Sequence, residues 1–257
     1  MTHKRPSVLV TRPEGQQVAL LNALKDRGLS FHHRGLIKIT DIPNDDQPLG
    51  VDARNKILAL DSYDGVIAIS RNAATIGLQW IDQYWPQLPV GIQWCAVGPT
   101  TASPLVTYGI NPLMPASRFD SEGLLACPEL KAAAVNGKKW LILRGVGGRE
   151  TLAETLLQRG ARVDYAELYH RVEQKYDQYS WDEALSDKPI LIISSGQALS
   201  MIERQVQDLV NRVEAVIIPS ERVARQARET GYKTVLVAAS ARNEDTLACL
   251  DAYIRAS

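Results

Sequence analysis

The chain contains an internal repeat. The segment Leu9–Gly28 aligns with Leu141–Gly160 without a gap, which places Arg12 over Arg144. Each copy begins with an apolar stretch, continues through a polar turn that contains glycine, and ends with an amphipathic stretch that stops at glycine. This order predicts a buried strand followed by a helix, present twice.

Two further pairs of segments repeat in the same order. They are Gly65–Gly77 with Pro189–Met201, which places Ser70 over Ser194, and Trp94–Gly109 with Ala215–Gly231, which places Pro99 over Pro219. A short strand is predicted after each member of the last pair, at Ile110–Ala116 and at Tyr232–Ala239. Apolar strands that alternate with helices predict an α/β fold, with helices on both faces of a parallel sheet. The duplication therefore predicts two similar parallel-sheet β/α lobes, with the cleft between them as the expected ligand site.

Two predicted strands lack the glycine or proline break that a lobe boundary would carry. These strands, Leu29–Ile39 and Ala161–Glu173, each follow the first helix of a repeat. We expect them to carry the chain between the lobes as a two-stranded linker. The first lobe would then contain both termini, as residues 1–36 plus 172–257, and residues 37–171 would form the inserted second lobe.

Hydroxyl and guanidinium side chains follow the predicted strands. In open parallel sheets, ligands bind beyond the carboxyl ends of the strands, so these side chains are candidates for substrate binding. The candidates are Arg12, Ser70, Thr100, Thr101, Arg144, Ser194, Ser195 and Ser220. For the two arginines the alternative is an ordinary surface salt bridge.

The segment that follows the strand Trp94–Val97 shows why two interpretations stay open. Gly98-Pro99 predicts a turn, Thr100 or Thr101 would cap the next helix, and Pro104 would lie in its first turn. Such a helix start presents free N–H groups that suit a carboxylate or phosphate. The alternative is that the threonines only cap their helix.

Composition excludes several classes of function. Lys+Arg and Asp+Glu both number 29, so charge gives no support to general nucleic-acid binding. The three cysteines and four histidines follow no metal-ligand spacing, so we expect no metal and a reducing compartment. The apolar runs fall short of membrane-spanning length, and an N-terminus without a signal peptide favours the cytoplasm. The loop Arg144–Glu150 lacks both complete phosphate-binding glycine patterns, which disfavours a nucleotide enzyme.

Six motifs, taken in order, resemble the uroporphyrinogen-III synthase family over almost the whole chain. They are "VLVTRP", "DGVIAISRNAA", "AVGPTTA", "RGVGGRETLAETLLQRGA", "AELYHR" and "ILIISSGQA". The resemblance implies a HemD-like fold with flavodoxin-like layering, in which a two-stranded linker joins the lobes and both termini lie in one lobe. It also implies a lyase that needs no cofactor. This enzyme cyclises hydroxymethylbilane to uroporphyrinogen III, inverts ring D and releases water, as a step of haem biosynthesis.

The resemblance also assigns roles to single residues. The tyrosine implicated in the family corresponds to Tyr169 of "ELYHR", which we expect to donate to the leaving hydroxyl; a phenol carries its proton at neutral pH. Tyr165 lies four residues earlier, on the same face of one predicted strand, and we expect it to serve in packing. Thr101 matches the family's threonine in its Gly-x-x-Thr-Ala segment. As partners we expect this linear tetrapyrrole polycarboxylate and hand-over from hydroxymethylbilane synthase, with the chain acting as a monomer.

One segment departs from the family pattern. "IPSERVA" places Glu221 where a threonine is common, which weakens this second helix start as a carboxylate site unless Arg222 compensates. A non-catalytic two-lobed binding protein for a small polyanion remains the alternative function. In that protein, Tyr169 would serve only in packing.

Overall fold

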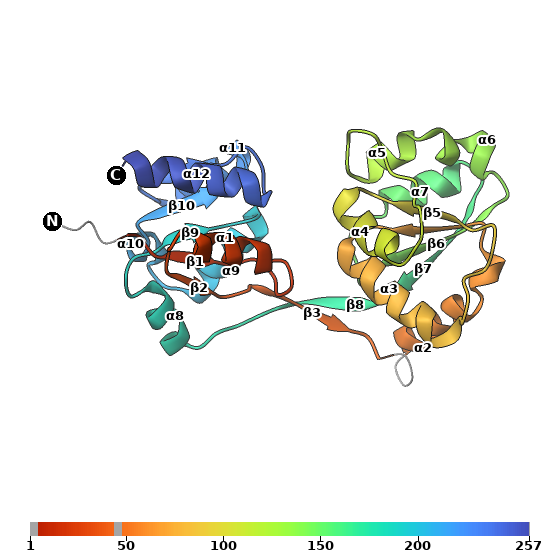
Figure 1. The fold of residues 1–257 in the computed structure, drawn as a ribbon, viewed down its shortest axis with the longest axis horizontal. Helices are drawn as coiled ribbons and strands as arrows, with labels where there is room; N and C mark the ends of the chain where they lie inside the picture. The colour runs from red at the N-terminus through yellow and green to blue at the C-terminus, as the bar shows by residue number, and fades with distance from the viewer. Residues whose placement is uncertain (1–4, 44–47, 257) are drawn as a thin grey trace. The chain divides into compact units, whose positions relative to one another are not determined.

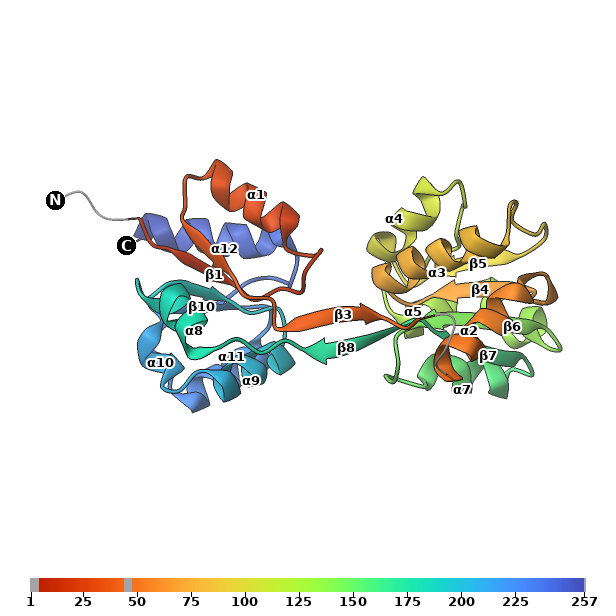
Figure 2. The same cartoon turned by 90° about the horizontal axis from the view of Figure 1, so that it is seen from below.

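The chain folds as two compact units, which the computed structural model describes over residues 5–43 and 48–256. Unit 1 comprises Met1–Ile39 and Val172–Ser257, and unit 2 comprises Thr40–Arg171 (Figure 1). The chain passes from unit 1 to unit 2 along β3 (Ile37–Asp41) and returns along β8 (Tyr169–Glu173). These two strands pair with each other, and their arrows run in opposite directions (Figure 2).

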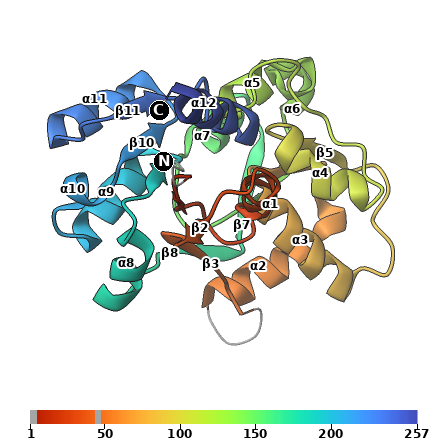
Figure 3. The same cartoon turned by 60° about the vertical axis from the view of Figure 1, so that its left-hand side comes forward.

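Unit 1 is built on a five-stranded sheet in the order β11-β10-β9-β1-β2, and all its neighbouring strands are parallel. Its strands are β1 (Val8–Val10), β2 (Phe31–His33), β9 (Ile190–Ile192), β10 (Ala215–Ile218) and β11 (Val235–Val237). Its helices are α1 (Val18–Asp26), α8 (Gln178–Leu185), α9 (Gly196–Gln205), α10 (Leu209–Arg212), α11 (Glu221–Thr230) and α12 (Asn243–Ala256). The strand β11 forms one edge of this sheet, near α11 and α12 (Figure 3).

Successive residues of the central strands pack against opposite helix layers. Val8 and Val10 lie in a buried cluster with side chains of α1 and α12, whereas Leu9 lies in a cluster with side chains of α8, α9, α10 and α11. Figure 2 shows these two helix layers on either side of the sheet. A strand covered on both faces must be apolar at every position, which explains the uninterrupted sequence Val8-Leu9-Val10.

Unit 2 has a four-stranded parallel sheet in the order β5-β4-β6-β7. Its strands are β4 (Gly65–Ala68), β5 (Gln93–Ala96), β6 (Lys139–Arg144) and β7 (Arg162–Glu167). Its helices are α2 (Pro48–Leu58), α3 (Arg71–Tyr84), α4 (Pro99–Thr107), α5 (Ser121–Ala126), α6 (Ala132–Val135) and α7 (Thr151–Gln158), with short 3₁₀ turns at Leu60–Ser62 and Pro128–Leu130. Figure 1 shows α5, α6 and α7 on one side of the sheet and α2, α3 and α4 on the other.

The two sheets share one topology, as the repeat predicts. In the aligned order, β1 corresponds to β6, β2 to β7, β9 to β4 and β10 to β5, and the spatial order agrees. The predicted fold class, α/β with two similar parallel-sheet lobes joined by two strands, is confirmed. The strand predicted at Ile110–Ala116 is wrong: this segment contributes only an isolated bridge between Leu113 and Cys95. Asn111, Pro112 and Pro115 leave little chain that could form a ladder.

The strand pairing corrects the register of the repeat. Leu141 pairs with Val66, and its counterpart Leu9 pairs with Leu191, so Val66 corresponds to Leu191. Ser70 therefore corresponds to Ser195, one residue later than the sequence alignment predicts. By the same argument Trp94 corresponds to Val216, because these residues pair with Val66 and Leu191 respectively.

The correspondence of Trp94 with Val216 also moves the alignment of the two following helix starts by two residues. Gly98 now matches Ser220, and both are N-cap residues, of α4 and α11 respectively. Pro99 matches Glu221, and Thr100 matches Arg222. Glu221 therefore does not stand at a threonine position: Thr100 corresponds to Arg222, and Thr101, which matches the family's threonine, corresponds to Val223.

Each long strand predicted as a linker is in fact two strands. Leu29–Ile39 contains β2 and the first residues of β3, and Ala161–Glu173 contains β7 and β8. The first half of each extends its sheet, and the second half pairs with the other linker strand. Tyr165 and Tyr169 thus belong to different strands, and the expectation that they share a face of one strand is wrong.

Candidate active site

Ser70 and Tyr169, two of the predicted site residues, meet within unit 2. Ser70 follows β4, and Tyr169 begins β8 one residue after β7 ends, so both lie at the carboxyl edge of the parallel sheet. The Tyr169 hydroxyl lies 2.9 Å from Ser70 Oγ. Ser70 Oγ also accepts a hydrogen bond of 3.0 Å from the backbone N–H of Ala73, which caps α3. The pair therefore places two hydroxyl groups at a helix N-terminus, where the dipole favours negative charge.

The ring of Tyr169 is held tightly. The residue is 1% exposed, whereas Ser70 is half-buried. A Cβ on Gly145 would lie 2.5 Å from Tyr169 Cε2, so only glycine allows this close approach of the backbone to the ring. Val146 N–H donates to the Tyr169 carbonyl at 2.9 Å and fixes the two segments side by side. Since the ring is covered, the more accessible member of the pair is the serine hydroxyl.

Arg144, one of the predicted substrate ligands in this unit, donates its hydrogen bonds to protein oxygens. It is 1% exposed, and Nη1 donates to Glu150 Oε1 at 3.1 Å. Nη2 donates to the Gly147 carbonyl, and Nε donates to the Gly145 carbonyl at 3.2 Å. Glu167 Oε1 completes the surroundings at 3.8 Å from Nε. All three guanidinium nitrogens thus donate to oxygens of unit 2, and because the side chain is buried it is not an exposed salt bridge.

The threonines at the start of α4 do not cap it. The helix begins at Pro99, and its N-cap is Gly98, with no side-chain cap. Thr101 is buried in the first turn, whereas Thr100 is exposed beside it. Pro104 lies inside the helix and not in its first turn, because the helix starts earlier than predicted. Capping is therefore excluded as the explanation of these two hydroxyls.

Unit 1 contains a serine cap that corresponds to the Ser70 cap of α3, but no tyrosine hydroxyl is recorded in contact with it among the described residues. Ser195 Oγ accepts from the Ala198 N–H at 3.1 Å and caps α9, with Ser194 half-buried before it. Ser220 is the N-cap residue of α11, with an extended backbone and no side-chain cap hydrogen bond. Both helix starts follow central strands of the same parallel sheet, at the edge that favours ligand binding.

Arg12 lies at the end of β1 and is tied to the segment that precedes α12. Its Nη2 donates to the Ala241 carbonyl at 2.6 Å, and its Nη1 donates to Asn243 Oδ1. Burial lowers the pKa of this guanidinium, and the opposing effect of Glu244 is smaller. Its buried Nε has no hydrogen-bond partner among the described residues. Part of its donor capacity is therefore unused.

Arg222 lies next to the capped start of α9. Its Nη1 is 3.9 Å from the position that a Cβ would take on Gly196, the residue after Ser195. The side chain is exposed, and within the described residues no ion pair or hydrogen bond engages its guanidinium. The Glu221 carboxylate instead accepts from Arg228 at 3.2 Å along its own helix. The arginine therefore adds positive charge beside Ser195, and the glutamate is partly neutralised.

Several residues of this site escaped the sequence analysis. Glu150 and Glu167 surround Arg144, and Gly145 covers the Tyr169 ring; all three lie in the quoted motifs, but no role was predicted for them from the sequence. Tyr165, expected only to pack, donates through its hydroxyl to Glu150 Oε2, and the Arg144 guanidinium lies 4.4 Å from its ring centroid. The closely spaced glycines after Arg144 carried the signal: they indicate a backbone that approaches another group closely.

Neither a metal cluster nor a membrane span emerges from the residues that the structure describes. Over residues 5–43 and 48–256, no group of three or more His, Cys, Asp or Glu side chains is placed to hold a metal ion. In the same ranges, no helix combines the length and the apolar character that crossing a membrane requires. The chemistry available at the site is that of hydroxyl, carboxylate and guanidinium groups.

Comparisons with known proteins point to one family. The family model described as uroporphyrinogen-III synthase HemD matches residues 17–248. A uroporphyrinogen-III synthase from Escherichia coli (strain K12) is 35% identical over 95% of this chain and 99% of its own length, and one from Salmonella typhimurium is 33% identical over the same shares.

Solved structures show the same fold. Uroporphyrinogen-III synthetase from Helicobacter pylori 26695 superposes with a TM-score of 0.62 at 15% identity, covering 96% of this chain and 99% of that one. A mutant uroporphyrinogen III synthase from the extremely thermophilic bacterium Thermus thermophilus gives 0.58 at 14% identity, covering 98% and 100%. The resemblance of the six ordered motifs is thereby confirmed, and the chain belongs to the uroporphyrinogen-III synthase family.

Proposed function

We propose that this chain cyclises hydroxymethylbilane to uroporphyrinogen III, and that Tyr169 and Ser70 together supply the proton for the leaving hydroxyl. The activity is that of the family, a lyase of haem biosynthesis, and the alternative of a non-catalytic binding protein has no support. The observation that carries the catalytic assignment is the 2.9 Å contact between the Tyr169 hydroxyl and Ser70 Oγ.

The proton path follows from burial. Tyr169 is covered by Gly145, and Ser70 is the half-buried partner, so the phenol donates to Ser70 and the serine donates to the substrate. Ser70 Oγ has lone pairs for both the Tyr169 hydroxyl and the Ala73 N–H, which leaves its own proton free to point outward. A phenol is protonated at neutral pH and needs no metal for this role.

The Tyr169–Ser70 pair donates one proton at the start of the reaction and regains one proton at the end. The carbon–oxygen bond of the hydroxymethyl group breaks as the pyrrole nitrogen supplies electron density, and the hydroxyl leaves as water with the donated proton. The substituted α-carbon of ring D then bonds to the CH2 carbon that has lost water, which gives a spiro intermediate. The older bond from this α-carbon to its bridging CH2 group breaks, and the bridging CH2 group bonds to the free α-carbon of ring D, which inverts the ring. The proton lost from that carbon as the pyrrole regains aromaticity restores the pair.

The substrate carries acetate and propionate groups, so it is a polyanion, whereas the chain has no net charge. We assign its carboxylates to hydroxyls and N–H groups at helix starts, where the dipole is positive. The residues proposed for this role are Thr100, Thr101, Ser194, Ser195 and Ser220, with Arg12 and Arg222 as cations. Ser195 and Ser220 are supported by their half-buried N-cap positions, and Arg222 by its open guanidinium.

The finer assignments concern supply of the substrate and oligomeric state. Hydroxymethylbilane closes spontaneously to the uninverted type I isomer, so transfer directly from hydroxymethylbilane synthase would limit that loss. We propose this hand-over, with the chain acting as a monomer. Direct transfer is tested by mixing the two proteins and measuring the yield of type III product as the mixture is diluted. The monomeric state is tested by sedimentation.

The central test is an isomer assay. Freshly prepared hydroxymethylbilane is incubated with the protein, and the type I and type III products are separated after oxidation. We expect type III to predominate with the protein and type I to predominate without it. A product that is type I in both samples would refute the proposed activity.

A further inference from the structure

We propose that Arg144, Glu150, Tyr165 and Glu167, here called the Arg144 cluster, position the catalytic tyrosine by holding the glycine loop against its ring. This inference rests on the proposed role of Tyr169. It assigns Arg144 to positioning and removes it from the set of substrate ligands.

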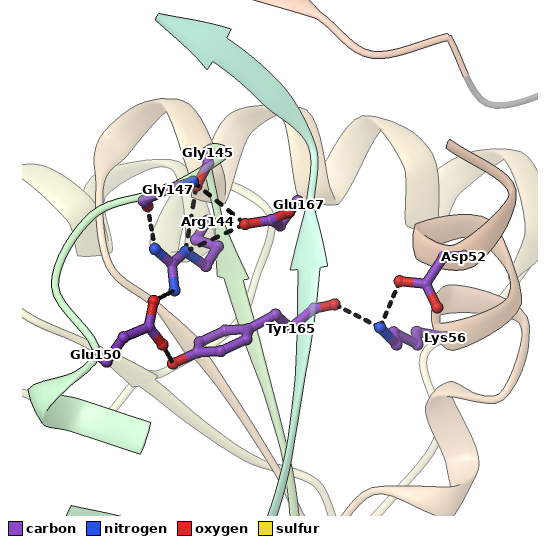
Figure 4. A network of polar contacts seen from close by, with 8 residues as sticks. All are labelled: Asp52, Lys56, Arg144, Gly145, Gly147, Glu150, Tyr165 and Glu167. Atoms are coloured by element: carbon purple, nitrogen blue, oxygen red, sulfur yellow. Dashed lines mark hydrogen bonds and ion pairs between the residues drawn. The ribbon is translucent and has the colours of Figure 1, made fainter. Parts of the chain in front are cut away.

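The cluster fixes the loop through the guanidinium group (Figure 4). Arg144 donates to the carbonyl oxygens of Gly145 and Gly147, so one side chain defines the path of the loop. Gly147 has a φ of +72°, which an L side chain rarely adopts, and its N–H donates to Glu167 Oε1 at 3.3 Å. The loop is thus held from both its carbonyl side and its N–H side.

The guanidinium is itself fixed by Glu150 and Tyr165. Glu150 accepts from Nη1 at 3.1 Å, and the other oxygen of the same carboxylate accepts from the Tyr165 hydroxyl. The guanidinium carbon lies 4.4 Å from the centroid of the Tyr165 ring, within the range of a cation–π contact. Lys56 donates to the Tyr165 carbonyl at 2.9 Å, which ties this strand to α2. Figure 4 shows these contacts as one continuous network.

Gly145 transmits the geometry to the catalytic pair. Its missing side chain leaves room for the Tyr169 ring, whose Cε2 and Cζ atoms would lie 2.5 and 2.7 Å from a Cβ. The flanking backbone is paired as well, since Leu168 N–H donates to the Arg144 carbonyl at 2.9 Å. A shift of the loop therefore moves the ring, and the ring carries the hydroxyl that contacts Ser70.

Stability alone does not account for this arrangement. Taking a guanidinium out of water costs free energy that its ion pairs only partly recover, and apolar replacements of such groups are often equally stable. A cation with several rigid donors, in contrast, defines one geometry for the carbonyls that it contacts. The Arg144 guanidinium therefore serves to fix the position of the glycine loop beside the Tyr169 ring.

The test combines cluster variants with Tyr169→Phe. Arg144→Met removes the guanidinium, Tyr165→Phe removes the hydroxyl that orients Glu150, and Gly145→Ala pushes directly on the ring. For each variant, kcat, KM and the ratio of type III to type I product are measured, alone and in the Tyr169→Phe background. Thermal unfolding identifies any variant that does not fold. If Arg144→Met is lost in this way, the other two variants carry the test.

We expect Arg144→Met and Gly145→Ala to lower kcat by about tenfold to a hundredfold with little change in KM, because a displacement of about 1 Å can cost about a hundredfold. Tyr165→Phe should lower kcat less. In the Tyr169→Phe background all three should cause almost no further loss. A rise in KM at constant kcat for Arg144→Met would instead identify a substrate ligand, and this result would overturn the inference.

The matched control lies near the opposite end of the same strands. The Tyr63 hydroxyl donates to Asp164 at 2.8 Å, and Lys139 lies 4.2 Å from the Tyr63 ring centroid. These residues thus combine a tyrosine, a carboxylate and a cation as the Arg144 cluster does, but they do not hold the glycine loop. Tyr63→Phe should leave kcat unchanged. If Tyr169→Phe itself keeps full turnover, the proposed role of Tyr169 fails, and this inference fails with it. If Tyr169→Phe is impaired but the cluster variants multiply its effect, that role stands and only the inference fails.

Discussion

The hydroxyl of Tyr169 and the Oγ of Ser70 lie 2.9 Å apart, although 99 residues separate them along the chain. Ser70 is set by the end of β4, and Tyr169 by the break between β7 and β8. The contact thus depends on the sheet of unit 2 and on the start of the linker strand. It joins the two groups that the proposed proton transfer requires.

The first prediction concerns Tyr169→Phe. Removal of the phenol oxygen should lower kcat by about a hundredfold, the lower end of the range for general acids, because substrate positioning is retained. The isomer assay with a measured initial rate checks this. Turnover equal to that of the unmodified protein would show that the phenol has no part in the reaction.

The second prediction separates the two functions of Ser70. Ser70→Ala removes both the cap of α3 and the partner of the phenol, so it should lower the free energy of unfolding by about 1 kcal/mol and also lower kcat. Asp177→Ala is the control, because Asp177 caps α8 through Ser180 N–H at 2.8 Å and lies in unit 1 without such a partner role. Asp177→Ala should lower the free energy of unfolding by a similar amount and leave kcat unchanged. Ser70→Thr, which keeps the oxygen, should recover most of the rate.

If Tyr169 and Ser70 act as one relay, their effects are not additive. The double variant should then be scarcely slower than the slower of the two single variants. Multiplication of the two losses would indicate that each hydroxyl reaches the substrate independently.

The third prediction concerns Arg222 and charge. Arg222→Gln should raise KM about fivefold and leave kcat unchanged, because it removes one exposed cation that we propose binds a substrate carboxylate. Added salt should shrink the difference, since exposed charges are screened. Arg225→Gln, three residues further along the same helix, is the control and should leave KM unchanged. Equal effects of both variants would point to general attraction and not to a binding contact.

The fourth prediction concerns pH and the stability of the Arg144 cluster. The hydrogen bond from Tyr165, followed by the contacts with Arg144, lowers the pKa of Glu150 below its ordinary value of 4.5. The folded chain therefore binds fewer protons than the unfolded chain just below that pH, so the stabilisation is present above about pH 4.5 and is lost as the pH falls through the folded pKa.

Glu150→Gln should flatten this acid dependence. Chemical unfolding measured at intervals from pH 6 to pH 3 checks it, with the slope compared between the two proteins. Burial and the Glu150 hydrogen bond raise the pKa of Tyr165, so its contribution has the opposite sign: it is present below pH 10 and is lost above. Identical pH profiles for Glu150→Gln and the unmodified protein would contradict the assigned coupling.

The sequence predicted the order of elements well because the duplication repeats an apolar strand followed by an amphipathic helix. It predicted the register poorly. The sequence repeat places Ser194 over Ser70, yet the ladders of β1 with β9 and of β4 with β6 make Ser195 the counterpart. Register is defined by which backbone groups pair across strands, and a run of similar apolar residues leaves that choice open.

The candidate site, too, was predicted only in part from the sequence. The tyrosine and the serine were predicted as separate candidates, one from the family motif and one from its strand end. Their contact depends on where a long apolar stretch breaks into β7 and β8, and single-sequence patterns locate such breaks poorly. The role of Arg144 was missed for a related reason: its partners Glu150 and Glu167 are ordinary charged residues until the fold surrounds a buried guanidinium with them.

The position of β1 has a consequence for synthesis on the ribosome. The strand lies between β2 and β9, and the Thr11 hydroxyl bonds the carbonyl of Ile192, 181 residues later. Unit 2 emerges whole between the two portions of unit 1, so it can fold while β1 has β2 beside it but still lacks β9. The nascent chain therefore has to keep the apolar strand Val8–Val10 from misassembly until its last third has been translated.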